Sequence, residues 1–198
     1  AEKEGIEISK VPAKAVASKL VYEAEITVQH PKLWWPNGYG EQPLYELAVS
    51  VELNGGQIQR VTKTIGLRTL TVSQEADAWG NEFAFLVNGV KIFTKGANYI
   101  PEDAVYPWID EKRIDYLLRC CVRAHFNCVR VWGGGYYPSD AFYDLCDRYG
   151  LIVWQDLMYA CNVYDVTDDF AATVRQETLD NVRRLRHHAS LGLWCGNN

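Results

Sequence analysis

A strand, a helix and a second strand follow one another within residues 128–156, CVRVWGGGYYPSDAFYDLCDRYGLIVWQD. The two ends of this stretch, Cys128–Trp132 and Leu151–Trp154, are short apolar runs of the kind found in strands that are buried on both faces. A helix is predicted between them, because Ser139 is a good N-cap and Gly150 is a good left-handed stop. Two buried strands joined by one helix predict a parallel pair.

The alternation of strands and helices continues on both sides of that unit. A helix is predicted from about Asp110, another over about 168–187, and a strand over 191–195. A doubly wound open sheet would carry its glycine-rich turn after the first strand, whereas Gly133–Gly135 follows the second. A (β/α)8 TIM barrel fits better. Such a barrel needs roughly 250 residues, so residues 73–198 are predicted to be its N-terminal half, which is the catalytic domain in barrel enzymes.

Before residue 73 the hydrophobic period is two. Alternating runs predict antiparallel strands over 22–28, 45–53 and 58–65, with a hairpin at Asn54-Gly55-Gly56. About four strands can be counted, whereas an immunoglobulin-like sandwich has about seven. Residues 1–72 are therefore predicted to be part of an immunoglobulin-like β-sandwich, which makes the chain multidomain, β followed by α/β. A further hairpin is predicted at Asn88-Gly89.

The composition is that of a globular protein and excludes two classes of partner. The 198 residues are 48% hydrophobic, and a net charge of −5 without runs of like charge gives no surface for nucleic acid. The longest apolar runs are far shorter than the roughly 20 residues that span a membrane. Residues 1–10 lack the pattern of a signal peptide. The 7 Trp and 12 Tyr suit either a core or flat walls that contact sugars.

No metal and no cofactor is predicted. The six cysteines lack CxxC or CxH spacing, so most are expected to be buried free thiols rather than zinc ligands or a redox motif. His187 and His188 are adjacent, and adjacent side chains on a helix point about 100° apart. The two histidines are therefore expected to lie at an exposed helix end without a shared ligand.

Alternation within the predicted strands selects candidate site residues. Arg130 and Trp132 share one face of their strand and point toward the barrel axis near its C-terminal end, where barrel enzymes place their sites. Asp156 ends the next strand in the register of Trp154, so it is expected to reach the axis too. An inward guanidinium needs a carboxylate partner, and an ion pair of Arg130 with Asp156 is one alternative to a role in binding. Simple core packing is the alternative for Trp132.

Several motifs resemble glycoside hydrolases of family 2. Four are similar to the junction of sandwich and barrel in that family: LWWPNGYGEQPLY at 33–45, GLRTL at 66–70, FLVNG at 85–89 and KGAN at 95–98, followed by Pro101. Four more resemble the β-mannosidase branch of the family: NCVRVWGGGY at 127–136, FYDLCDRYG at 142–150, WQD at 154–156 and WCGNN at 194–198. The resemblance covers about residues 20–198.

The resemblance implies an exo-acting retaining β-mannosidase that removes terminal β-linked mannose by double displacement. In the wider retaining clan an Asn in the position of Asn198 precedes the acid/base Glu and contacts the sugar 2-hydroxyl. The nucleophile would be a Glu near the seventh strand. Asn98 is expected to line the same mouth. The chain as printed contains neither catalytic carboxylate, so by itself it is expected to be inactive and to self-associate.

Other functions remain open at this point. Family 2 also includes β-galactosidases, β-glucuronidases and exo-glucosaminidases, and Trp132 with its three following glycines favours a mannosidase among them. From a different class, the chain is alternatively a non-catalytic carbohydrate-binding or scaffold module. Residues 187–190 and 159–169 depart from the pattern of the family, which puts the shape of the loops and the preference for the leaving group in doubt.

Overall fold

The computed structural model of the chain describes residues 14–16, 19–21, 26–53 and 56–198. By their internal contacts the residues form two compact units, 1–32 and 33–198. In the first unit, β1 (Lys14–Val16) and β2 (Lys19–Val21) form an antiparallel pair that the sequence did not predict. Residues 22–25 of the strand predicted over 22–28 lie outside the described residues, and 26–28 are not in a strand.

The second unit begins with the predicted antiparallel pair. Strands β3 (Tyr45–Leu53) and β4 (Gly56–Ile65) pair along their whole length, with Tyr45 opposite Ile65. Asn54 and Gly55, on which the hairpin prediction rested, lie outside the described residues. A two-stranded sheet has no second layer of its own, so the immunoglobulin-like sandwich stays a prediction.

A four-stranded parallel sheet follows, in the spatial order β11-β10-β9-β8. Its strands are β8 (Gly96–Tyr99), β9 (Cys128–Val131), β10 (Ile152–Asp156) and β11 (Leu191–Cys195). Sequence order equals spatial order, and each strand is joined to the next by a helix. This is the arrangement of consecutive strands in part of a (β/α)8 barrel. The predicted parallel sheet is thereby confirmed.

The three connecting helices are α1 (Glu111–Arg123), α2 (Asp140–Tyr149) and α3 (Asp168–Leu185). Helix α1 begins where the side chain of Asp110 accepts a hydrogen bond from the backbone N–H of Arg113. Helix α2 ends at Gly150, whose φ of 71° is the predicted left-handed stop. Ser139 occupies the N-cap position of α2, but its side chain makes no capping hydrogen bond.

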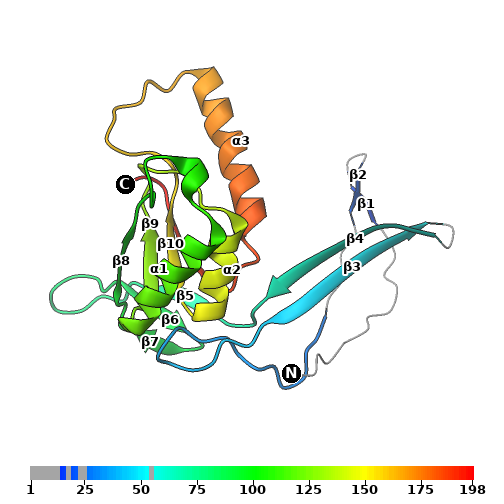
Figure 1. Ribbon diagram of the computed structural model, residues 1–198, viewed down its shortest axis with the longest axis horizontal. Coiled ribbons are helices and arrows are strands. Elements are labelled where there is room, and N and C mark those ends of the chain that lie inside the picture. The colour runs from blue at the N-terminus through cyan, green and yellow to red at the C-terminus, as the bar shows by residue number, and fades with distance from the viewer. Residues whose placement is uncertain (1–13, 17–18, 22–25, 54–55) are drawn as a thin grey trace. The chain divides into compact units, whose positions relative to one another are not determined.

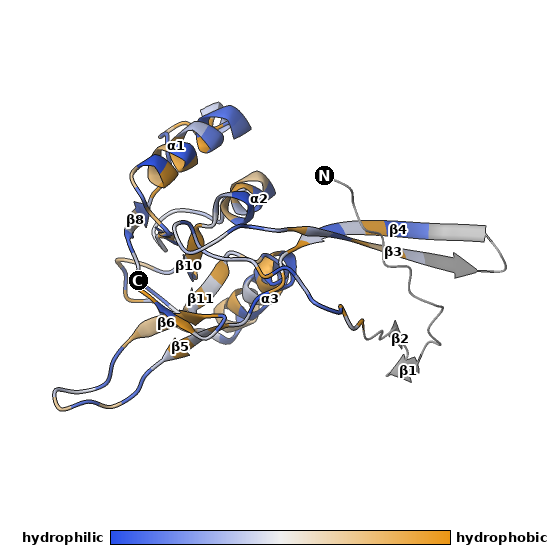
Figure 2. Ribbon diagram, turned by 90° about the horizontal axis from the view of Figure 1, so that it is seen from below, coloured by the Kyte–Doolittle hydropathy of each residue, from blue (hydrophilic) through white to orange (hydrophobic). Residues whose placement is uncertain are grey.

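The two faces of the parallel sheet pack against different layers. Val129 and Val131, which alternate with Arg130 along β9, belong to a core shared with the three helices. The opposite face, which carries Cys128 and Ile152, packs against a small antiparallel sheet. That sheet is formed by β5 (Leu70–Ser73), β6 (Ala84–Val87) and β7 (Val90–Ile92). Figure 2 shows α1 and α2 on one side of the strands and β5 and β6 on the other. The domain boundary predicted at residue 72 falls within β5 and stays a prediction.

A buried polar cluster fixes the start of β11. Asp147 on α2 is 1% exposed, and its two carboxylate oxygens bond the backbone N–H of Ser190 and Nδ1 of His188, both at 2.7 Å. The indole N–H of Trp34 donates to the backbone carbonyl of Asp147 at 2.7 Å. Arg68 donates to two carbonyl groups of residues 189–191. The segment containing Trp34 is thereby attached to the α2–β11 corner.

The prediction that both histidines lie at an exposed helix end is wrong for His188. Helix α3 ends at Leu185, two residues earlier than predicted, so the histidines occupy the turn after it. His188 is 3% exposed, and the two rings lie 4.1 Å apart. The physical reason is the Asp147 carboxylate, which gives a buried imidazole a hydrogen-bond partner.

The six cysteines are free thiols. The expectation that most are buried is wrong, because only Cys128 and Cys146 are buried, whereas Cys161 is exposed and the other three are intermediate. Burial raises the pKa of Cys128 to about 12. A thiol held protonated in this way is inert, which fits a packing role.

Candidate active site

Arg130 lies at the centre of a polar cluster at the C-terminal end of the parallel sheet. Its guanidinium contacts Asp156 at two points, with Nε 3.1 Å from Oδ1 and Nη2 2.7 Å from Oδ2. Nη2 also donates to Oδ1 of Asn198 at 2.7 Å, and Nη1 donates to Oδ1 of Asn98 at 3.3 Å. The guanidinium of Arg130 therefore connects Arg130 to three of the other four predicted site residues, Asp156, Asn98 and Asn198.

Strand register explains why these residues meet. Arg130 on β9 is paired with Asn98 on β8 and with Trp154 on β10. Paired residues of parallel strands point to the same face, so Asn98, Arg130 and Trp154 form one row on the axis side of the sheet. Asp156 lies two residues beyond Trp154 and therefore on the same face, directly above that row.

Asn198 joins the cluster from beyond β11. Its backbone N–H donates to the carbonyl of Tyr159 at 3.0 Å, which holds the end of the chain against the loop after β10. Its side-chain oxygen accepts from Arg130, so the amide nitrogen is the group left for another partner. The same holds for Asn98, whose oxygen also accepts from Arg130. Two carboxamide N–H₂ groups are thus presented by side chains that are exposed.

Sequence reasoning missed two members of the cluster. The backbone N–H of Gly133 donates to Oδ2 of Asp156 at 3.1 Å, which gives the buried carboxylate a third donor. A Cβ on Gly133 would lie 2.6 Å from the carbonyl oxygen of Leu157, so glycine permits this close approach. Trp154 lies beneath Arg130, with the guanidinium carbon 5.9 Å from the ring centroid, a cation–π contact. Its pairing with Arg130 in the sheet was the signal that could have found it.

Trp132 occupies a different position from the other predicted residues. It is partly buried, and its indole lies against the backbone of Gly134, where a Cβ would be 2.0 Å from the six-membered ring. The three glycines after Trp132 predict a loop that keeps space open above this ring. The structure instead has the glycine loop close over one face of the indole, because only a residue without a side chain fits there. Its contribution to a substrate site stays a prediction.

The cluster has the chemistry of a site for a neutral, hydroxyl-rich ligand. The side chain of Asp156 is 0% exposed and that of Arg130 is 26% exposed, so the carboxylate neutralises the guanidinium and holds it in place. The exposed groups above the pair are amide N–H donors rather than free charges. Hydroxyl oxygens are natural acceptors for such donors.

Comparison with known proteins relates the chain to a family of enzymes. Residues 1–68 match the family model "Glycosyl hydrolases family 2". Over 188 residues, which are 94% of the chain, the sequence is 42% identical to a β-mannosidase B of Aspergillus terreus. The resemblance of the chain to glycosyl hydrolase family 2 is confirmed by these two matches. The A. terreus relative confirms its resemblance to the β-mannosidase branch.

Solved structures of similar proteins agree with the fold. A β-D-mannosidase from Dictyoglomus thermophilum is 42% identical and superimposes on 90% of the chain with a TM-score of 0.87. An exo-chitosanase from Amycolatopsis orientalis is 20% identical over 87% of the chain, with a TM-score of 0.75, and is similar in fold alone. The chain spans about a fifth of the length of these relatives, 22% of the A. terreus protein and 22% of the D. thermophilum chain.

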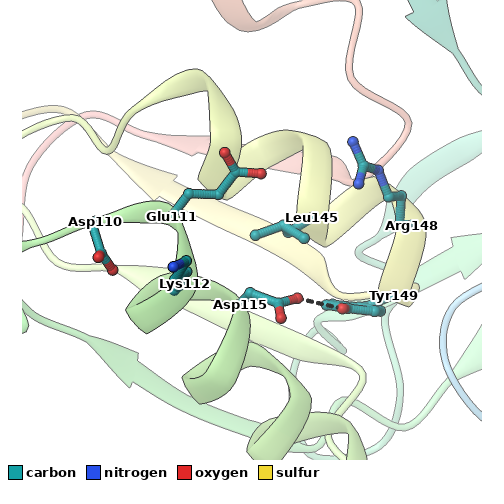
Figure 3. Close-up of a pocket in the computed structure, with 7 residues that line it drawn as sticks. All are labelled: Asp110, Glu111, Lys112, Asp115, Leu145, Arg148 and Tyr149. Carbon is teal, nitrogen blue, oxygen red and sulfur yellow. Dashed lines mark hydrogen bonds between the residues drawn. The ribbon is translucent and has the colours of Figure 1, made fainter.

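Two other features of the chain lie apart from the Arg130 cluster. A surface hollow of about 560 Å³ is formed between α1 and α2 (Figure 3). Both acidic and basic side chains line it, and none of them belongs to the predicted site. The lining residues are Asp110, Glu111, Lys112, Asp115, Leu145, Arg148 and Tyr149. A hollow between the outer faces of two helices lies on the far side of the sheet from the axis.

The second feature is a trio of possible metal ligands. Asp144, Asp147 and His188 offer ligand atoms within 4.8 Å of one another. Both oxygens of Asp147 already take part in hydrogen bonds within the buried cluster of α2 and β11, which accounts for the group without an ion.

In the part of the chain that the structure describes, no helix is long and apolar enough to cross a membrane.

Proposed function

We propose that the full-length protein is an exo-acting retaining β-mannosidase and that residues 73–198 are the N-terminal half of its catalytic (β/α)8 barrel. The cluster of Arg130 with Asp156, Asn98 and Asn198 carries the proposal, because it lies at the barrel end that holds active sites. The sequence identity of 42% to β-mannosidases supports the choice of sugar. We propose further that residues 1–72 belong to an immunoglobulin-like sandwich.

The proposed roles of the site residues follow from their contacts. Asn198 donates its amide N–H to the 2-hydroxyl of the sugar, a contact that strengthens as the ring distorts in the transition state. Arg130 fixes the orientation of that amide by binding its oxygen. Asp156 fixes Arg130, and Asn98 offers a second amide to another hydroxyl. Trp132 forms a wall of the same subsite.

Double displacement supplies the chemistry. One carboxylate attacks the anomeric carbon while a second carboxyl group, about 5 Å away, protonates the leaving oxygen. Water then cleaves the glycosyl–enzyme bond with the second group acting as base. Both carboxyl groups come from segments outside residues 1–198 in this proposal, so the residues described here bind and orient the sugar rather than react with it.

The test uses the full-length protein and a panel of 4-nitrophenyl β-glycosides. Turnover of the β-mannoside is expected, with the β-galactoside, β-glucuronide and β-glucosaminide at least about 100-fold slower, which corresponds to about 2.7 kcal/mol. NMR of the first-formed sugar should show β-mannose, the mark of retention. A stronger preference for another glycoside would assign a different family 2 specificity. Absence of turnover on the whole panel would favour a non-catalytic carbohydrate-binding module.

A further inference from the structure

The loop between β8 and α1 carries exposed aromatic side chains that the Arg130 cluster does not use. Within it, Tyr106–Trp108 form a short 3-10 helix. The side chain of Tyr106 is 53% exposed and that of Trp108 is 69% exposed. Two large aromatic side chains exposed within three residues of each other form a contiguous apolar patch, and such patches are found at binding surfaces.

Hydrogen bonds at both ends of the loop hold the backbone that carries these side chains. Glu102 at its start has a side chain that is 1% exposed and accepts a hydrogen bond from the hydroxyl of Tyr99 at 2.5 Å. Arg113 on α1 donates to the backbone carbonyl of Glu102 at 2.9 Å. The 3-10 turn is closed by two backbone hydrogen bonds, from Trp108 to Val105 and from Ile109 to Tyr106.

A neighbouring loop supports the exposed ring of Tyr106. Tyr136, in the loop after β9, meets it edge-to-face, with ring centroids 4.5 Å apart and planes at 82°. Pro101 also touches that loop, because a Cβ on Gly135 would lie 3.0 Å from its ring. An edge-to-face pair leaves the outer face of one ring free while fixing its orientation.

The loops place this surface beside the candidate active site. Pro101 begins its loop shortly after Asn98, and Tyr136 follows shortly after Gly133, whose backbone N–H binds Asp156. Both loops leave the C-terminal ends of their strands. The carboxyl terminus of the chain lies at that same end, in Figure 1 near the top of β8 and β9. Active sites of barrel enzymes are built from such loops.

We infer that Tyr106 and Trp108 form a platform for the sugar ring on the leaving-group side of the scissile bond. The ligand class is a β-linked manno-oligosaccharide, because a pyranose presents a flat face of C–H groups that suits an aromatic ring, while its hydroxyl groups stay at the edge in water. Tyr136 supports the platform and does not contact the sugar. This inference rests on the proposed glycosidase function.

The experiment compares two substrates of the full-length protein. β-Mannosyl fluoride has a leaving group without a ring, whereas β-1,4-linked mannobiose has a sugar ring there. The Tyr106→Ala/Trp108→Ala double variant is expected to lower the ratio of kcat/KM for mannobiose to that for the fluoride by about tenfold, the scale of one aromatic contact. Tyr106→Phe should keep the ratio of the wild-type protein, because the ring face rather than the hydroxyl makes the contact.

Tyr116→Ala is the matched control, since Tyr116 is 61% exposed on α1 and outside the loop. Its ratio should equal that of the wild-type protein. An unchanged ratio in the double variant, or equal loss on both substrates, overturns the platform while turnover by the wild-type protein leaves the proposed function standing. Equal loss that follows a lowered thermal midpoint shows that the rings pack against other parts of the chain. If the wild-type protein cleaves neither substrate, the proposed function falls and the platform falls with it.

Discussion

Arg130 and Asp156 form a two-point contact between neighbouring parallel strands, with Nε 3.1 Å from Oδ1 and Nη2 2.7 Å from Oδ2. The carboxylate is fully buried, and its third donor is a backbone N–H. Removing either partner would leave a charge without its counterion in a buried site, which is costly. The pair therefore both fixes the structure and holds Arg130 against Asn98 and Asn198.

We expect Arg130→Lys to lower kcat/KM of the full-length protein on an aryl β-mannoside by about 100-fold, or about 2.7 kcal/mol. A lysine keeps the charge but cannot bind both oxygens of Asp156 and the amide of Asn198 together. Arg119→Lys on α1 is the control, because Arg119 makes an exposed helical ion pair with Asp115. Equal kcat/KM values for the Arg130→Lys variant and the wild-type protein would show that Arg130 does not contribute to the substrate site.

Trp132→Ala separates a substrate wall from a core residue. If the indole lines the sugar subsite, kcat/KM should fall by about 100-fold or more, about 3 kcal/mol, while the urea midpoint of unfolding is kept. A core role predicts instead a loss of about 3–5 kcal/mol in stability through a cavity. Trp79→Ala is the control, since Trp79 is 95% exposed. A shift in the urea midpoint that accounts for all the lost activity would assign Trp132 to the core.

Strand periodicity and the resemblance to the family each predicted part of the candidate site. Alternation placed Arg130 and Asp156 on the axis face, whereas Asn198 was selected by the resemblance, with Asn98 expected to line the same mouth. Trp154 and Gly133 escaped prediction for different reasons. The register between strands brings Trp154 under Arg130, and a backbone N–H such as that of Gly133 has no side-chain signature in a sequence.

The burial of polar residues was the other feature that could not be predicted from the sequence. His188 was expected at an exposed helix end because the helix was predicted to continue to about residue 187. The helix ends earlier, and the turn after α3 directs the His188 side chain toward Asp147. Such a contact joins residues 41 positions apart, and local periodicity carries no information about it. The two-stranded pair β3–β4 was predictable from alternation for the opposite reason, since its pattern is local.

The Asp147 cluster gives a prediction about stability. Asp147→Ala should lower the free energy of unfolding of the full-length protein by about 3–5 kcal/mol, because it leaves the buried His188 and the backbone N–H of Ser190 without their acceptor. Asp144→Ala is the matched control on the same helix, since the Asp144 side chain is 44% exposed and lies 4.0 Å from His188. It should change stability by less than about 0.5 kcal/mol. Similar urea midpoints for the two variants would contradict a structural role for the buried pair.

The 198-residue polypeptide is expected to show no hydrolysis of aryl β-mannosides above background. Retaining hydrolysis needs two carboxyl groups about 5 Å apart. The carboxylate of Asp156 is bound by Arg130 and by the backbone N–H of Gly133, so it is not free to serve as either of these two catalytic groups. The measurement is nitrophenol release by the purified polypeptide, with a mock purification as control for contaminating enzyme. Turnover that survives this control would show that the two carboxyl groups of the reaction lie within residues 1–198.

The same polypeptide is expected to self-associate. Strands β8 and β11 are the edges of the four-stranded sheet, and a sheet edge offers unpaired backbone groups to another chain. Apolar side chains lie close to the β8 edge in sequence: Phe93 is 77% exposed and Ile100 is 57% exposed. Exposed backbone and exposed apolar surface together favour edge-to-edge pairing over a soluble monomer. Size-exclusion chromatography with light scattering at micromolar concentration should give a mass above that of one chain, and Phe93→Lys/Ile100→Lys should shift it toward the monomer. A sharp monomer peak with a cooperative thermal transition would mean that the polypeptide closes these edges by itself.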